Sequence, residues 1–125
     1  MDEKRRILFV DDEPGTVMAV QKRLELAGFD VLTAMDGEEA LIKARNLRPD
    51  LIVLDLQLPK LSGLKVCTML KQDPLYQQIP IIILTGKEEV VDERACRACG
   101  ADAYLTKSSG TPALIDRITE LLPTR

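Results

Sequence analysis

Four short apolar runs in this sequence each lead into a residue that carries a charge or a hydroxyl group. Residues 7–10 are followed by Asp11 and Asp12, and residues 51–54 by Asp55. Residues 81–84 are followed by Thr85, and residues 103–106 by Lys107. An open parallel sheet binds ligands in the crevice beyond the carboxyl ends of its strands. If the four runs are parallel strands, the sequence predicts that three carboxylates, a hydroxyl and an ammonium meet in one crevice.

Strand-like runs alternate with helical patterns along the whole chain, which is typical of a parallel sheet with helices on both faces. The expected strands cover residues 6–10, 30–34, 51–54, 80–84 and 102–105. The expected helices cover residues 14–27, 36–47, 62–73, 88–99 and 111–122. We therefore predict an α/β fold in which five helices cover both faces of a five-stranded, doubly wound parallel sheet.

Three of these elements carry more specific expectations. The second strand, 30–34, mixes polar with apolar residues and is expected at an edge, whereas the other four resemble covered central strands. The fourth helix, 88–99, has few large apolar side chains and is expected to be the least firmly attached. The fifth helix is expected to start with Thr111 as its cap and Pro112 at its first position.

The size and charge of the chain exclude several classes of protein. Its 125 residues are enough for one domain with a hydrophobic core, expected over about residues 5–122 with no effector domain. A net charge of −3 argues against a general nucleic-acid binder, which needs a basic stripe. No apolar signal segment precedes the first strand, and the longest apolar runs are about six residues, far below the roughly 20 that span a membrane. We expect a cytoplasmic protein without direct nucleic-acid or membrane binding.

The three cysteines are expected to be structural thiols. An odd number suits free thiols in a reducing compartment. Cys96 and Cys99 have the spacing of a redox motif, but they lie late in a predicted helix, where the helix dipole disfavours a thiolate. A structural zinc needs four ligands, and the chain offers Cys67, this pair and no histidine.

The predicted cluster of Asp11, Asp12 and Asp55 has a chemical consequence. Carboxylates that share a site must take up a proton or recruit a cation. An all-oxygen site open to solvent suits Mg²⁺, or Mn²⁺ in its place. Phosphoryl transfer depends mainly on positioning and charge stabilisation, to which Thr85 and Lys107 would contribute a hydrogen bond and a positive charge. One aspartate would then be free to act as a nucleophile and form an aspartyl phosphate.

The chain resembles the receiver domain of bacterial two-component response regulators, of the chemotaxis type, from Ile7 to Leu122. This resemblance implies a flavodoxin-like fold with strand order 2-1-3-4-5. The segments that carry it are Val10-Asp11-Asp12-Glu13-Pro14, the run 50–59 around Asp55, Leu61-Ser62-Gly63, Leu84-Thr85-Gly86, and the run 100–107.

The resemblance also implies how the acidic residues divide their roles. Asp55 would accept a phosphoryl group from the phosphohistidine of a histidine kinase or phosphotransfer protein. Asp12, Asp55 and the backbone carbonyl of Gln57 would ligate Mg²⁺ directly, and Asp11 would do so through water. The domain would catalyse only its own phosphorylation and dephosphorylation and would not be a conventional enzyme.

Further residues of the resemblance concern switching. Thr85 and Tyr104 would form the switch that remodels the surface of the fourth helix, fifth strand and fifth helix. That surface would bind a downstream effector protein or a covalently linked output domain, or form a phosphorylation-dependent dimer. Gln57 and Lys87 lie two residues beyond Asp55 and Thr85, where they would flank the attacking water and tune the lifetime of the phosphorylated state.

One departure and three alternatives accompany this resemblance. The family usually has a proline after the lysine, through a cis bond, whereas Ser108 follows here and a trans bond is expected. A dehalogenase-like phosphatase would require Asp-x-Asp after the first strand, and Asp11-Asp12-Glu13 departs from it. An FMN-binding flavodoxin-like protein would have its phosphate repelled by Asp11 and Asp12. A degenerate receiver that acts as a phosphorylation-independent interaction module usually lacks one of the acidic residues, the threonine or the lysine.

Overall fold

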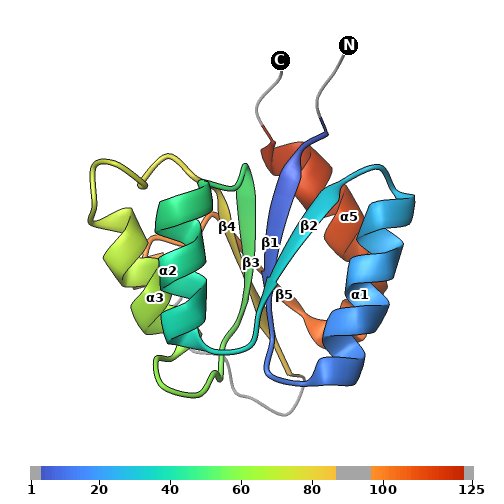
Figure 1. Cartoon of the computed structure of the whole chain (residues 1–125), viewed down its shortest axis with the longest axis horizontal. Helices are drawn as coiled ribbons and strands as arrows, with labels where there is room; N and C mark the ends of the chain where they lie inside the picture. The colour runs from blue at the N-terminus through green and yellow to red at the C-terminus, as the bar shows by residue number, and fades with distance from the viewer. Residues whose placement is uncertain (1–3, 87–96, 123–125) are drawn as a thin grey trace.

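The structure, a computed structural model, describes residues 4–86 and 97–122. Five parallel strands form one sheet in the order β2-β1-β3-β4-β5 (Figure 1). The strands are β1 (Arg6–Val10), β2 (Asp30–Ala34), β3 (Leu51–Asp55), β4 (Ile81–Thr85) and β5 (Ala103–Thr106). The described helices are α1 (Pro14–Leu26), α2 (Gly37–Leu47), α3 (Gly63–Lys71) and α5 (Gly110–Leu121), with a short 3₁₀ turn, η1 (Lys107–Ser109), before α5. The predicted fold class and strand order are confirmed; the fourth helix expected over 88–99 lies largely outside the described residues.

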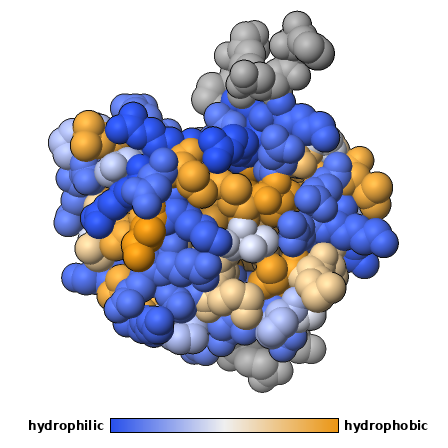
Figure 2. Space-filling model, viewed as in Figure 1, coloured by the Kyte–Doolittle hydropathy of each residue, from blue (hydrophilic) through white to orange (hydrophobic). Residues whose placement is uncertain are grey.

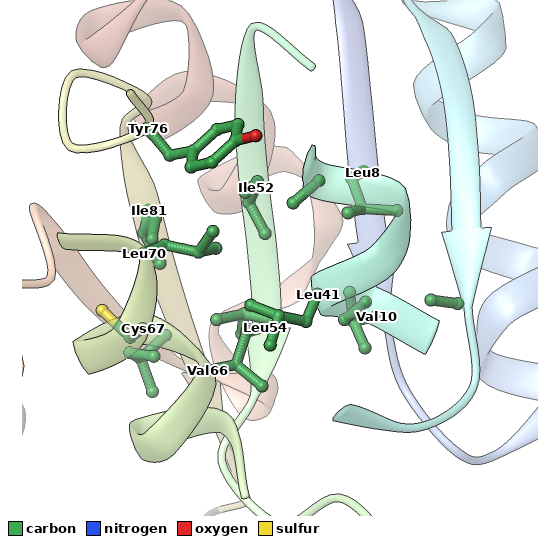
Figure 3. Close-up of a cluster of buried hydrophobic side chains, with 14 of the residues drawn as sticks. Leu8, Val10, Leu41, Ile52, Leu54, Val66, Cys67, Leu70, Tyr76 and Ile81 are labelled. Atoms are coloured by element: carbon green, nitrogen blue, oxygen red, sulfur yellow. The ribbon is translucent and has the colours of Figure 1, made fainter. Parts of the chain in front are cut away.

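Helices cover both faces of the sheet because side chains alternate along each strand. In β1, Leu8 and Val10 face the α2 and α3 side, whereas Ile7 and Phe9 face the α1 and α5 side. All four side chains are fully buried. Figure 3 shows the cluster on the α2 and α3 side, where side chains of β1 and β3 meet those of the two helices. The doubly wound arrangement therefore rests on strands that are apolar on both faces.

The two edges of the sheet agree only in part with the sequence prediction. β2 lies at one edge, as its mixed composition indicated. Figure 2 shows hydrophobic side chains between α1 and α2, over this edge strand, with hydrophilic ones on either side. β5 lies at the other edge, as the predicted strand order requires, and it is half-buried throughout, although its apolar run resembled that of a covered strand.

The helix starts show which capping signals are reliable. Ser62 caps α3 by accepting a hydrogen bond from the Lys65 amide, 3.2 Å away. The fifth helix was predicted to start at Thr111 and Pro112, but α5 begins at Gly110 and Pro112 is its third residue. This is physically reasonable, because the first four amides of a helix have no partner within it and proline is tolerated there.

The structure places two of the three cysteines in buried positions. The Cys67 thiol donates to the carbonyl of Cys99, 3.4 Å away, and both residues are buried and free. Burial raises the pKa of the Cys67 thiol, with a further rise from the neighbouring Cys99 thiol. Both observations fit structural thiols.

These thiols are expected to resist alkylation in the native protein. In a Cys96→Ser variant, which retains only Cys67 and Cys99, iodoacetamide should modify neither residue at pH 7, because both side chains are buried and the Cys67 thiolate is also disfavoured. In urea, both should be modified. Intact mass measured over time checks this, and rapid double labelling of the folded variant would contradict it.

Candidate functional site

The parallel register brings the predicted residues to the carboxyl ends of the strands, which form the lower rim of the sheet in Figure 1. Asp11 directly follows β1, Asp55 is the last residue of β3, and Thr85 is the last residue of β4. Lys107 directly follows β5. Carboxylate oxygens of Asp11, Asp12 and Asp55 all lie within 4.8 Å of one another. The structure therefore brings the three predicted carboxylates together, with the Lys107 ammonium beside two of them.

Asp11 is the most enclosed of the three acids, with a fully buried side chain. Its Oδ1 accepts a hydrogen bond from the Glu13 amide at 3.0 Å. Its Oδ2 lies 2.9 Å from the Lys107 Nζ, but this contact is ionic in geometry, because Oδ2 has no hydrogen-bond partner among the described residues. A buried carboxylate oxygen without a hydrogen bond is costly unless a cation compensates it.

Lys107 bridges two of the acids. Its Nζ lies 3.2 Å from Asp55 Oδ2 as well as 2.9 Å from Asp11 Oδ2. Burial lowers the pKa of Lys107, but its close contacts with the two carboxylates and their negative charges outweigh burial and raise that pKa above its ordinary value. The lysine therefore stays charged. For Asp55, burial raises the pKa, as does the charge of Asp11, and together they outweigh the opposing effect of Lys107.

This shift predicts a pH-dependent effect of Asp55→Asn on stability. The fold favours protonated Asp55; that contribution is fully present below the ordinary pKa of 3.8 and is lost as the pH rises through the higher folded pKa. In metal-free buffer at pH 7, the ionised carboxylate therefore costs stability, and Asp55→Asn should have a higher thermal midpoint than the parent. The difference should shrink as the pH approaches 4. Circular dichroism melts of both proteins measure it; a difference that stays constant across this range would contradict the assignment.

The donor set of this edge fits a hard divalent cation. A cavity of about 350 Å³ opens beside the acids; its walls include Asp12, Asp55, Gln57 and Lys107. Three carboxylates with oxygens within 4.8 Å of one another supply the oxygen ligands that a Mg²⁺ site requires. Asp12 is exposed toward solvent, so an ion can keep several of its waters. The residues present therefore fit the predicted metal.

The other predicted site residues have varied surroundings. Thr85 is fully buried, and its hydroxyl lies 3.5 Å from the Leu105 carbonyl oxygen, at the long limit of a hydrogen bond. Gln57 is exposed on the cavity wall. Tyr104 is half-buried and lines a different hollow, of about 530 Å³, along β5. Lys87 lies outside the described residues. No cis peptide bond occurs in the described ranges, so the bond before Ser108 is trans, as expected.

Sequence reasoning missed one residue directly behind the site. Gly63 starts α3, and its amide donates to the Leu56 carbonyl at 3.0 Å. A Cβ built on Gly63 would overlap the carbonyl oxygen of Asp55. Gly63 was part of the motif Leu61-Ser62-Gly63, but the motif alone does not show which backbone approaches it. Only the tertiary fold gives this glycine its role.

Comparisons with known proteins agree with this geometry. The family profile described as "Response regulator receiver domain" matches residues 7–119. The chain is 47% identical over 118 residues to the alkaline phosphatase synthesis transcriptional regulatory protein PhoP of Bacillus subtilis, covering 94% of this chain and 48% of PhoP. The chemotaxis response regulator CheY4 of Vibrio cholerae superimposes with a TM-score of 0.88 at 30% identity, covering 96% of this chain and 100% of that one. Response regulator TrrA of Thermotoga maritima, solved in complex with Mg²⁺-BeF, superimposes with a TM-score of 0.85 at 34% identity, covering 94% of this chain and 99% of that one.

These relatives show the family of the chain, but they do not show a subtype within it. PhoP is named as a transcriptional regulator and CheY4 as a chemotaxis protein, so the chemotaxis type is not singled out. The chain spans about half the length of the curated relatives it matches. The matched profile, the strand order and the acidic edge lead to the same conclusion. The chain belongs to the response regulator receiver domain family of two-component signalling.

Proposed function

We propose that Asp55 accepts a phosphoryl group from the phosphohistidine of a histidine kinase or phosphotransfer protein. The observation that carries this proposal is the convergence of Asp11, Asp12 and Asp55 on one edge with Lys107 in contact with two of them. In the proposed site, Asp12, Asp55 and the carbonyl of Gln57 hold Mg²⁺ or Mn²⁺ directly, and Asp11 holds it through water. The bound ion would draw in the phosphoryl oxygens and offset their charge. As a receiver domain, the chain is not a conventional enzyme.

The chain's own residues supply the nucleophile and a fixed positive charge. An ionised oxygen of Asp55 attacks phosphorus, a P–O bond forms as the P–N bond to histidine breaks, and the leaving imidazole takes up a proton. Lys107 offsets charge on the transferred group, and the Thr85 hydroxyl donates a hydrogen bond to one of its oxygens. Lys107 is 3.2 Å from Asp55 Oδ2 before the reaction, so its movement to the phosphoryl group is short.

The proposed switch connects Thr85 with Tyr104. Thr85 pairs with Thr106 in the sheet register, and Tyr104 pairs with Ile83 on the same two strands. A phosphoryl group adds about −1.5 to −2 charge beside Lys107 and gives Thr85 a stronger acceptor than the Leu105 carbonyl. When Thr85 turns toward it, the space near β5 changes and the Tyr104 ring moves inward. This gives the two states different contacts, which a population shift requires.

The experiment that tests the function is incubation of the purified protein with acetyl phosphate and Mg²⁺, followed by intact mass. A gain of one phosphoryl group that requires the metal supports the proposal. No gain under any metal condition would favour the alternative, a degenerate receiver that acts as a phosphorylation-independent interaction module. This alternative is disfavoured, because such modules usually lack one of the acidic residues, the threonine or the lysine. The chain has all of them: Asp11, Asp12, Asp55, Thr85 and Lys107.

Gln57 and Lys87 are proposed to tune the lifetime of the phosphorylated protein. Gln57 lies on the wall of the acidic cavity, where it can flank the water that attacks the phosphoryl group. Replacing both residues with alanine is expected to change the rate constant of dephosphorylation severalfold, with little effect on Mg²⁺ affinity. The decay of the phosphorylated mass after acetyl phosphate is removed measures it. An unchanged rate constant would remove both residues from this role.

The partners and setting follow from the proposed reaction. The two-component context implies a histidine kinase as the donor. We further propose a single receiver domain with its core over about residues 5–122, acting on an effector protein or a linked output domain, with dimerisation on phosphorylation as one form of output. None of the described helices combines the length and apolarity of a bilayer span. We propose a cytoplasmic location, where such kinases deliver phosphoryl groups.

A further inference from the structure

Residues 34–37, which join β2 to α2, are hydrogen-bonded to both loops that carry the proposed magnesium ligands. The amide of Asp11 donates to the carbonyl of Ala34 at 3.1 Å, which fixes one end of the segment to the first acidic loop. The amide of Gly37 donates to the carbonyl of Pro59 at 3.1 Å, which fixes its other end to the loop between β3 and α3. We call residues 34–37 the brace, because they connect the two loops.

The contact between the brace and the second loop leaves no room for a side chain. A Cβ on Gly37 would overlap the carbonyl oxygen of Leu61 and lie 2.6 Å from the Leu61 Cβ. The overlapping oxygen belongs to the backbone, so it cannot rotate away as a flexible side chain would. The separation of brace and loop is therefore set by the absence of a side chain at Gly37.

Two carboxylates hold the brace in its conformation. Asp36 Oδ1 caps α2 by accepting from the Glu39 amide at 2.7 Å, and this bond lowers the pKa of Asp36. Asp36 Oδ2 lies 3.5 Å from Nζ of Lys60, a residue of the second loop. Glu39 Oε1 in turn accepts from the Met35 amide at 2.7 Å. The brace is thus fixed on its own helix and at the loop it contacts.

We propose that the brace sets the spacing between the two halves of the magnesium site, and that Gly37 and Asp36 are positioning residues for the metal. The inference rests on the proposed function, which takes Asp11 and Asp12 from one loop and the Gln57 carbonyl from the other. Mg²⁺ demands near-ideal octahedral geometry with short bonds, so a displaced loop should weaken binding although every ligand is still present.

Isothermal titration of Mg²⁺ into the parent protein and Gly37→Ala tests the inference. Gly37→Ala should bind Mg²⁺ about tenfold more weakly, the size of effect typical of residues that orient metal ligands. The matched control is Ala44→Gly, which weakens the same helix about two turns beyond Gly37 and lies outside the brace. This control should bind Mg²⁺ like the parent. Parent-like affinity in Gly37→Ala, or an equal loss in both variants, would overturn the inference.

A second pair of variants decides the question if Gly37→Ala does not fold. Asp36→Ala and Asp36→Asn lose the same charge, but asparagine can still cap the helix. A larger loss of Mg²⁺ affinity in Asp36→Ala than in Asp36→Asn supports positioning by the brace, whereas equal affinities overturn it. A parent protein that does not bind Mg²⁺ would overturn the proposed function as well. The titration of the parent shows this before any variant is compared.

Discussion

Replacing Asp55 with asparagine is expected to abolish the phosphoryl gain that the parent protein shows with acetyl phosphate and Mg²⁺. Asparagine has nearly the same shape, but its neutral amide oxygen is a poor nucleophile and cannot form the acyl phosphate. The neighbouring residues cannot take its place easily: Asp11 is fully buried and bonded to the Glu13 amide. Intact mass after incubation, with the folded state checked by circular dichroism, measures the loss.

The matched control for this variant is Asp116→Asn, the same chemical change on an exposed position of α5. It should become phosphorylated to the same extent as the parent. Asp55→Asn itself is expected to stay folded, because it removes a carboxylate that burial disfavours. A phosphoryl gain that persists in Asp55→Asn and is released by hydroxylamine would instead place the acceptor on another carboxylate, with exposed Asp12 as the first to examine.

The second large effect is expected from Gly63→Ala, which should destabilise the protein and slow its phosphorylation together. The added methyl group would overlap the carbonyl oxygen of Asp55, and the nearest atoms are all backbone. Such overpacking costs about 1–3 kcal/mol and occasionally more. Because the peptide of Asp55 must move to make room, the carboxylate on the same residue moves as well. Urea unfolding gives the free energy, and the rate of mass gain with acetyl phosphate gives the chemical effect.

Gly15→Ala provides a matched control, since Gly15 also lies in the first turn of a helix. A Cβ there would meet only the side-chain Oε1 of Glu13, at 3.1 Å; this oxygen accepts from the Gly15 amide at 2.8 Å and needs to shift by only a few tenths of an ångström. Gly15→Ala should therefore be close to neutral, or stabilise by about 0.4–1 kcal/mol through the unfolded chain. If the two variants lost equal stability, the crowding behind Asp55 would not explain the effect of Gly63→Ala.

The part of this structure that sequence could predict is the part determined by local pattern and topology. The parallel sheet and the meeting of Asp11, Asp12, Asp55 and Lys107 follow from the apolar runs and the rule that parallel strands present their carboxyl ends at one end of the sheet. The strand order came from the resemblance to the receiver family. The helix caps at Ser62 and Asp36 are also local features, because each side chain accepts a hydrogen bond from the backbone amide three residues further along the chain.

The features that could not be predicted from the sequence depend on contacts between segments that are distant along the chain. Gly37 and Gly63 are required because backbone from another loop or strand approaches them, and nothing in their own surroundings in the sequence reveals that approach. The start of α5 at Gly110, one residue before the predicted cap, was also not predicted. The roles of Lys87 and of the fourth helix stay predictions, because residues 87–96 lie outside the described ranges.

The position of Lys107 has a consequence for how the protein is made. The acids come from the first and third strands to be synthesised, but the cation that contacts two of them follows the fifth strand, 52 residues after Asp55. While the chain emerges from the ribosome, the carboxylates can gather before their counter-charge exists, and their repulsion then opposes early docking of β1 against β3. With the role proposed for Lys107, competence to receive a signal should arise only in the last stage of folding, when β5 pairs with β4.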